Sequence, residues 1–205
     1  MTGLELFIWY AMPGGTLAVA LYVVDPQFWG NQRIPEGLWL AGLPLLGYCL
    51  HQLFRIVFEK RGGWENPRLR PSLAALQKQL DIPQESHSPC SAFLVWEVTF
   101  YSDCFPESFR QRDIRTWHYL ISFWTVAFSC AVGMIILLPG LLVSDNWKTN
   151  ALWIVVLGVV GSVFFLKGKL THTSLMELES AVMTRHEEAF KKTKDKLCPS
   201  DKEKA

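Results

Sequence analysis

Charged residues are distributed so unevenly along this chain that four long stretches contain no Asp, Glu, Lys or Arg. These stretches are residues 6–24, 37–54, 116–144 and 149–166. At about 1.5 Å of helical rise per residue, 18 residues or more span roughly 27 Å or more, close to the thickness of a bilayer's hydrocarbon core. We therefore predict an all-α integral membrane helical bundle, with four transmembrane helices in two hairpins. The predicted spans are about 6–24, 37–57, 117–143 and 149–167.

Two of the predicted spans contain residues that disturb a helix. Pro13-Gly14-Gly15 lies inside the first span, where a missing amide and two flexible residues predict a hinge at which the helix kinks or unwinds. Pro139-Gly140 lies near the end of the third and longest span. We expect that span to end or bend there.

The polar region between the second and third spans is too long for a simple loop, so a small helical insert is expected over 59–115. Pro71-Ser72 predicts the start of a helix with Leu73, Leu76 and Leu80 on one face. A second helix is expected over 91–103, packed inside the insert or lying on the membrane face, because it is too short to cross. The predicted divisions are a first hairpin at 1–58, the insert at 59–115, a second hairpin at 116–168, a tail helix at 169–190 and a disordered Lys-rich tail at 191–205.

The basic residues predict which way the chain crosses the membrane. Nine of the 20 lie between Arg55 and Arg115 and nine from Lys167 onward, while the two short connectors hold one each, Arg33 and Lys148. Basic residues concentrate on the cytoplasmic side of membrane proteins. We therefore expect a multi-pass protein of the cell membrane with its N- and C-termini in the cytoplasm.

Composition narrows the possible ligands. The formal net charge of +1 gives no argument for nucleic acid as a partner. The five cysteines form no CxxC pair and no metal-ligand spacing, so reduced thiols acting as small apolar residues are expected. Met1 to Glu5 contains no Lys or Arg, so the first span is expected to stay in the mature protein rather than to be cleaved as a signal peptide. We predict no metal and no cofactor.

A candidate functional polar cluster lies at the predicted cytoplasmic ends of the second and third spans. His51, Arg55 and Glu59 follow at helical spacing and share one face, and His118 lies at a similar predicted depth. A histidine at this depth could titrate or pair with a carboxylate. A helix end at the interface, with Arg55 reaching towards water, explains the same pattern. Arg112 and His118 also have the Arg-x5-His spacing found in HEPN ribonucleases, but here it crosses the predicted membrane boundary.

The tail helix carries a seven-residue repeat. His172, Glu179 and His186 recur beside a row of apolar residues, Met176, Met183 and Phe190. In an oligomeric coiled coil these would form rings of His and Glu beside an apolar seam. An amphipathic helix that packs on the insert of its own chain explains the pattern equally well.

Small residues predict helix packing inside the membrane. Ser129-x3-Gly133 and Gly158-x3-Ser162 lie mid-span, where small side chains let helices approach closely. No charged residue lies mid-span, and the chain contains no phosphate-binding loop, no His-Glu-x2-His pair and no nucleophile elbow. An enzyme is therefore not expected.

Three functions fit these features. The first is an oligomeric pore-forming or membrane-perturbing effector, or channel, controlled by its cytoplasmic domain, with the lipid bilayer and further copies of the chain as partners. The second is a non-conducting adaptor or regulator that binds a cytosolic protein. The third is an interfacial enzyme that uses His51, His118 and Glu59.

Overall fold

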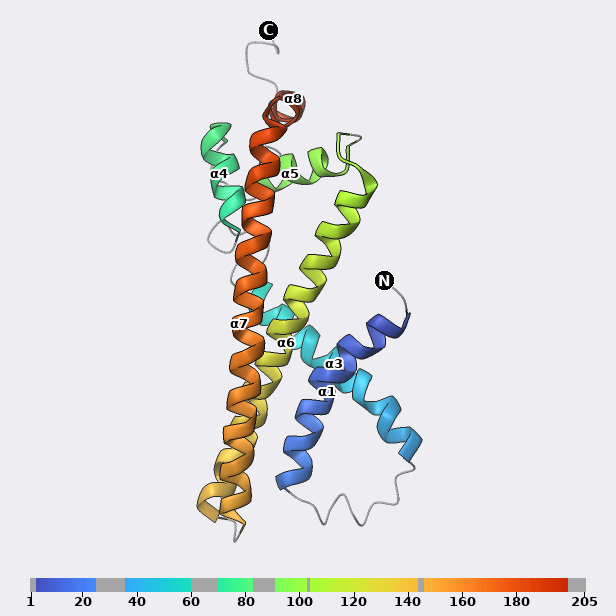
Figure 1. Ribbon diagram of the computed structural model, residues 1–205, viewed down its shortest axis with the longest axis vertical. Coiled ribbons are helices and arrows are strands. Elements are labelled where there is room, and N and C mark those ends of the chain that lie inside the picture. The colour runs from blue at the N-terminus through green and yellow to red at the C-terminus, as the bar shows by residue number, and fades with distance from the viewer. Residues whose placement is uncertain are drawn as a thin grey trace. The chain divides into compact units, whose positions relative to one another are not determined.

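The computed structural model describes residues 3–24, 36–59, 70–82, 91–102, 104–143 and 146–198. Within these ranges the chain forms seven helices and no strand (Figure 1). They are α1 (Gly3–Val24), α3 (Glu36–Glu59), α4 (Pro71–Gln79), α5 (Ala92–Phe100), α6 (Glu107–Val143), α7 (Trp147–Arg185) and α8 (Glu187–Leu197). The predicted all-α class is confirmed. Two helices, α6 and α7, are long and apolar enough to cross a membrane, while the apolar parts of α1 and α3 are shorter.

The helices form two compact units. Unit 1 consists of Met1–Val57 and His118–Leu170, and unit 2 of Phe58–Trp117 and Thr171–Ala205. Unit 1 therefore holds α1, most of α3 and the hairpin end of α6 and α7. Unit 2 holds α4, α5, α8 and the other ends of α6 and α7. These two long helices each contribute to both units without a break.

Within unit 1, α1 crosses α3 at two glycines. A Cβ built on Gly14 would lie 1.9 Å from the carbonyl oxygen of Leu43, and one on Gly47 would lie 1.6 Å from that of Tyr10. Only glycine permits so close an approach of two backbones. The helix does not unwind at Pro13-Gly14-Gly15, because α1 is helical from Gly3 to Val24 with Pro13 inside it, and the kink predicted there stays a prediction. Gly14 serves the crossing of the two helices instead of unwinding one.

The hairpin end of α6 and α7 has its own apolar core. Ala20 of α1, Val126, Cys130 and Leu137 of α6, and Leu157 of α7 are buried together. The predicted end or bend of the third span at Pro139-Gly140 is not seen as a helix end, because α6 continues to Val143. Gly140 instead makes room for Asn150, whose side-chain nitrogen lies 2.2 Å from the position of an added Cβ.

The core of unit 2 joins α4, α5 and α8. Leu73, Leu76 and Leu80 are almost fully buried, as the spacing predicted, and Phe190 of α8 is fully buried against Trp96 of α5. Local sequence sets the helix ends. Pro71 begins α4 at a position where no amide partner is needed. Ser91 caps α5 by accepting a hydrogen bond from the amide of Leu94 at 3.2 Å.

The end of α4 is fixed by a left-handed residue. Asp81 has a φ of 51°, and the amide of the buried Ile82 donates to the carbonyl of Gln77 at 3.0 Å. This is the Schellman arrangement that terminates many helices. It turns the chain so that Ile82 joins the core of unit 2.

Two expectations for the C-terminal region need correction. Residues 191–197, predicted to be disordered, are part of α8, because Phe190 anchors that helix in the core and Lys191 pairs with Glu187 one turn earlier at 2.6 Å. Cys198 is disulfide-bonded, so the expectation that all cysteines are reduced is wrong there. Cys49, Cys104 and Cys130 are free thiols.

Candidate functional site

A buried ion pair lies at the centre of unit 2. Nε of Arg70 donates to one carboxylate oxygen of Glu179 at 3.0 Å, and a terminal guanidinium nitrogen donates to the other oxygen at 2.7 Å. The two side chains are 7% and 0% exposed. A two-point contact between a planar guanidinium and a carboxylate fixes both groups in orientation as well as in distance. The pair therefore connects the segment before α4 to α7.

Two tryptophans enclose the guanidinium. The Cζ atom of Arg70 lies 5.0 Å from the ring centre of Trp96 on α5 and 5.0 Å from that of Trp117 on α6. Aromatic faces attract a cation, and do so more strongly where water is excluded. Trp117 also donates its indole N–H to Glu179 at 3.2 Å. Arg70 thus holds parts of α5, α6 and α7 around one charge.

Ser72 completes the shell of Glu179. Its hydroxyl, 2% exposed as a residue, donates to the carboxylate oxygen that also accepts from Nε of Arg70. The same hydroxyl lies 3.7 Å from the sulfur of Met176, one helical turn before Glu179. Glu179 therefore accepts hydrogen bonds from three side chains, which compensates the cost of removing its charge from water.

A second carboxyl group, Asp113 of α6, lies in the same buried region. It is 3% exposed, and its Oδ1 has no hydrogen-bond partner. Burial raises the pKa of Asp113 to about 7, and the charge of Glu179 adds to the rise while that of Arg70 opposes it. Near neutral pH this carboxyl group therefore exchanges between a protonated and an ionised form.

The chemistry of this site is electrostatic. Among the described residues, no group of three His, Cys, Asp or Glu could hold a metal ion. With Asp113 protonated, the site contains one cation and one anion, so its formal charges balance. With Asp113 ionised, two carboxylates share one guanidinium in a buried environment, where an uncompensated charge is costly.

The residues of the repeat predicted on the tail helix make different kinds of contact within the chain. Glu179 pairs with Arg70 of its own chain, and Met176, Met183 and Phe190 are buried in the same chain. His172 lies edge-on to Trp117, and His186 lies 4.8 Å from the ring centre of Phe105. In the structure the repeat thus packs within unit 2. This agrees with the interpretation of the pattern as an amphipathic helix that packs on its own chain.

The predicted polar cluster at the ends of the spans is assembled only in part. Nδ1 of His51 lies 3.3 Å from the hydroxyl of Thr125, and its ring meets Tyr10 edge-on at 5.5 Å. His51 is within electrostatic range of Arg55 and His118. Arg112 is exposed and belongs to unit 2, and the Glu59 side chain lies outside the described part of the structure.

The predicted helix-packing residues lie in two environments. Ser129 is fully buried, and a Cβ on Gly133 would lie 3.1 Å from Leu157 and 3.2 Å from Ala20, so this pair faces the chain's own core. Gly158 is half-buried beside Met134, and Ser162 is exposed. Between α6 and α7, an added Cβ would lie 2.2 Å from Asn150 on Gly140, 2.6 Å from Trp124 on Gly168 and 2.9 Å from Cys130 on Gly161. Gly161 was not among the predicted packing residues.

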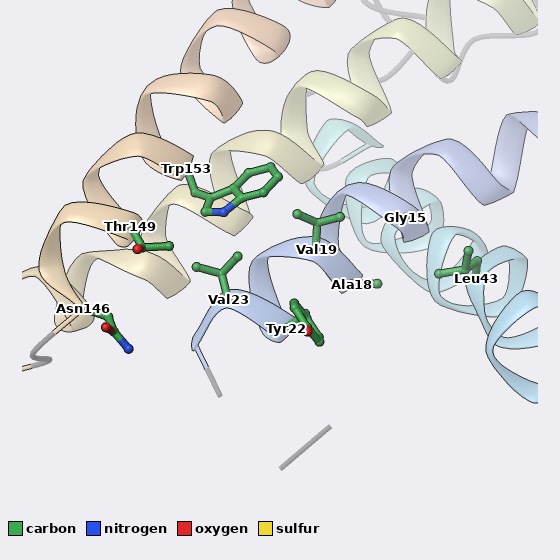
Figure 2. A pocket seen from close by; sticks show the side chains of 9 residues that line it. All are labelled: Gly15, Ala18, Val19, Tyr22, Val23, Leu43, Asn146, Thr149 and Trp153. Atoms are coloured by element: carbon green, nitrogen blue, oxygen red, sulfur yellow. The ribbon is translucent and has the colours of Figure 1, made fainter. Parts of the chain in front are cut away.

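Unit 1 contains a cavity of about 610 Å³, formed by α1, α3 and the start of α7. Figure 2 shows Val19 and Val23 of α1 near the indole of Trp153, with Leu43 on the other side of α1. Gly15 helps to form the space, because a Cβ added there would meet no atom within 4 Å. None of the residues that line the cavity is charged. Its polar groups are the hydroxyls of Tyr22 and Thr149, the amide of Asn146 and the indole N–H of Trp153.

Arg70 and Asp113 were not predicted as site residues. The weak sequence signal at Arg70 is its place directly before the helix-starting Pro71. Asp113 lies among Arg110, Arg112 and Arg115, a pattern typical of an exposed helix face. No known family model, no curated protein and no solved structure matches this chain.

Proposed function

We propose that this chain is a four-span membrane protein that assembles into an oligomeric pore or membrane-perturbing effector controlled by unit 2. The observation that carries this proposal is the continuity of α6 and α7, each of which runs from the polar site of unit 2 into a charge-free stretch of unit 1. A change in how unit 2 holds these helices would move their membrane segments without an intermediate linker.

The exposed surface of unit 1 supports a location in the membrane. Leucine and valine side chains recur on one face of α7 at intervals of three or four residues and are exposed to the surroundings. They are Leu152, Val155, Val159, Val163, Leu166 and Leu170. A water-soluble monomer rarely exposes so large an apolar surface, whereas lipid tails or further helices cover it without cost.

A pore formed by this protein requires several copies. Among the described mid-span hydroxyls, those of Thr125 and Ser129 are buried and donate to carbonyls of their own helix, at 2.8 Å each. Neither of these two hydroxyls is available to line a water path through a single chain. Ser162 is exposed on α7 beside the apolar row, where it can face another copy or a shared water path.

The sidedness is part of the proposal. The distribution of basic residues favours unit 2 in the cytoplasm, but a disulfide at Cys198 is uncommon in a reducing compartment. Two locations of unit 2 are therefore possible, inside the cell or outside it. They are distinguished by labelling intact cells with a membrane-impermeant reagent at a cysteine introduced for Lys192. Labelling only after permeabilisation supports a cytoplasmic unit 2, and labelling of intact cells overturns it.

The function is tested with the full chain in liposomes that contain a self-quenched dye. We expect dye release together with cross-linked species larger than a monomer. Ser162→Phe adds bulk on the exposed face of α7 and should change the cross-linking pattern and reduce release. Leu152→Phe is the matched control, because it exchanges one large exposed side chain for another on the same face. A monomer that releases no dye would exclude the pore.

A specific observation favours the adaptor as a second candidate. Val98 and Tyr101, at the end of α5 in unit 2, are 42% and 58% exposed. Exposed aliphatic and aromatic side chains are common where a protein partner binds. Because this adaptor is non-conducting, the unmodified chain should release no dye, and replacing both residues with Ser should abolish co-purification of a protein partner. If no partner co-purifies with the unmodified chain, this candidate fails.

A further inference from the structure

We propose that Asp113 is a proton-binding site that sets how firmly the Arg70–Glu179 pair holds α6 and α7 together within unit 2. Its role in opening the membrane segments rests on the proposed function, whereas the proton site rests only on the packing of unit 2.

The site connects two helices directly. Asp113 and Trp117 are one turn apart on α6, and Glu179 on α7 accepts a hydrogen bond from the indole of Trp117. Arg70, from the segment before α4, pairs with Glu179 and lies against Trp117. Any charge that develops on Asp113 therefore acts on groups that belong to both helices.

The surroundings of Asp113 compensate its charge only in part, through Arg70. On α6, the guanidinium of Arg110 donates to the carbonyl of Tyr101 at 3.1 Å and to Glu107 at 2.8 Å, and Arg112 and Arg115 are exposed. From α7 come Glu179 and His172, the latter beside Trp117. On α5 the carboxylate of Glu97 is exposed, and on α8 Lys194 donates to the carbonyl of Leu80.

Arg70 is thus the cation that acts on Asp113. Its guanidinium already donates two hydrogen bonds to Glu179. When Asp113 binds a proton, the buried region contains one positive and one negative group. When it releases the proton, a second carboxylate competes for the same guanidinium while Oδ1 has no donor. Release of the proton therefore weakens the contact between α6 and α7, and binding strengthens it.

The sign of the pH effect follows from the two states of the carboxyl group. In an opened unit 2 the Asp113 carboxyl has the ordinary pKa near 3.8, and in the closed unit burial raises that pKa to about 7. The closed state therefore binds more protons between these values. The opening constant should rise about tenfold per pH unit up to about pH 7 and then remain level.

The test is hydrogen exchange of the full chain in lipid nanodiscs, followed by mass spectrometry on peptides from α4 and α5. Rates are corrected for the intrinsic dependence of exchange on pH and compared from pH 5.5 to 8.5. We expect the opening constant to increase by at least tenfold over the lower part of this range. Asp113→Asn, which cannot ionise, should be flat, and Glu177→Gln, an exposed carboxylate on α7, should retain the slope.

Two results would overturn the proton site: a flat wild-type profile, or a slope that persists in Asp113→Asn. If Asp113→Asn does not fold, infrared titration of the wild-type chain tests the same point. A protonated carboxyl band should then disappear with a midpoint near pH 7, and its absence at pH 5.5 would contradict the proposal. The readouts separate this inference from the pore. Exchange that depends on Asp113 without dye release refutes only the pore, and dye release without this dependence refutes only the proton site.

Discussion

Arg70 and Glu179 lie 109 residues apart in the sequence, yet they form a two-point ion pair that is almost completely buried. Breaking such a pair leaves a charge without compensation, whereas replacing both partners with apolar groups of similar volume costs much less. We predict that Glu179→Ala lowers the free energy of unfolding of unit 2 by about 3–5 kcal/mol. Denaturant titration followed by tryptophan fluorescence measures it, because Trp96 and Trp117 flank Arg70.

The double variant Arg70→Met with Glu179→Leu should recover most of that loss, because no buried charge remains. Glu177→Gln, which changes an exposed carboxylate on the same helix, should unfold like the wild type. If Glu179→Ala and the double variant were equally destabilised, the lost stability would come from packing and not from an uncompensated charge.

The shape of the guanidinium should matter as well as its charge. Arg70→Lys keeps a cation but cannot make the paired hydrogen bonds or lie flat between two indoles. We expect it to lower the free energy of unfolding by about 1–3 kcal/mol, combining the loss of a charge-assisted hydrogen bond with weaker contacts to the rings.

Trp117→Phe isolates one part of this arrangement. It keeps an aromatic face beside Arg70 but removes the indole N–H that donates to Glu179. A loss of about 1 kcal/mol is expected in the same fluorescence assay, in which Trp96 is one of the eight tryptophans that remain.

The contradicting outcome for the earlier Arg70→Lys prediction is a chain as stable as the wild type. It would show that the geometry of the guanidinium contributes nothing to the stability of unit 2.

Sequence predicted the helical class and the helices α4 and α5 of unit 2, for identifiable reasons. The spacing of Leu73, Leu76 and Leu80, and the starts at Pro71 and Ser91, depend on neighbouring residues only. The site itself depends on contacts between distant segments. The seven-residue spacing singled out Glu179 as part of a repeat, not as half of an ion pair. No local pattern relates it to Arg70, because α4, α5 and α6 lie between the two residues in the sequence. Asp113 has the sequence surroundings of an exposed residue.

The first span shows the same limit. Pro13-Gly14-Gly15 predicts flexibility when only its own helix is considered. The structure uses Gly14 for contact with Gly47 and Leu43 of α3, which are more than 25 residues away. Whether a glycine supplies flexibility or space is decided by the partner helix, and the sequence does not identify that helix.

The tail helix α8 should be essential for the stability of unit 2. Phe190 is fully buried, stacks on Trp96 at 5.6 Å between ring centres and lies 6.3 Å from Phe105. Truncating a buried Phe to Ala usually costs about 3–5 kcal/mol, so Phe190→Ala should reduce the free energy of unfolding by that amount. Lys192→Ala, at an exposed position of the same helix, is the control and should change it by less than about 0.5 kcal/mol. An equal effect of the two substitutions would mean that α8 does not pack on α5.

The glycines where α1 crosses α3 supply a matched test of that contact. Gly14→Ala or Gly47→Ala would place a methyl group within 2 Å of a backbone carbonyl oxygen, so the two helices must separate. Gly15→Ala and Gly42→Ala add the same group where no atom lies within 4 Å. Alanine also favours a helix by about 1 kcal/mol over glycine, so the two sets should change stability in opposite directions. In detergent, the first pair should lower the thermal midpoint, while the second pair should leave it unchanged or raise it. If all four substitutions lowered the thermal midpoint, the glycines would be needed for flexibility of the helices. The crossing would then not explain why α1 contains Gly14.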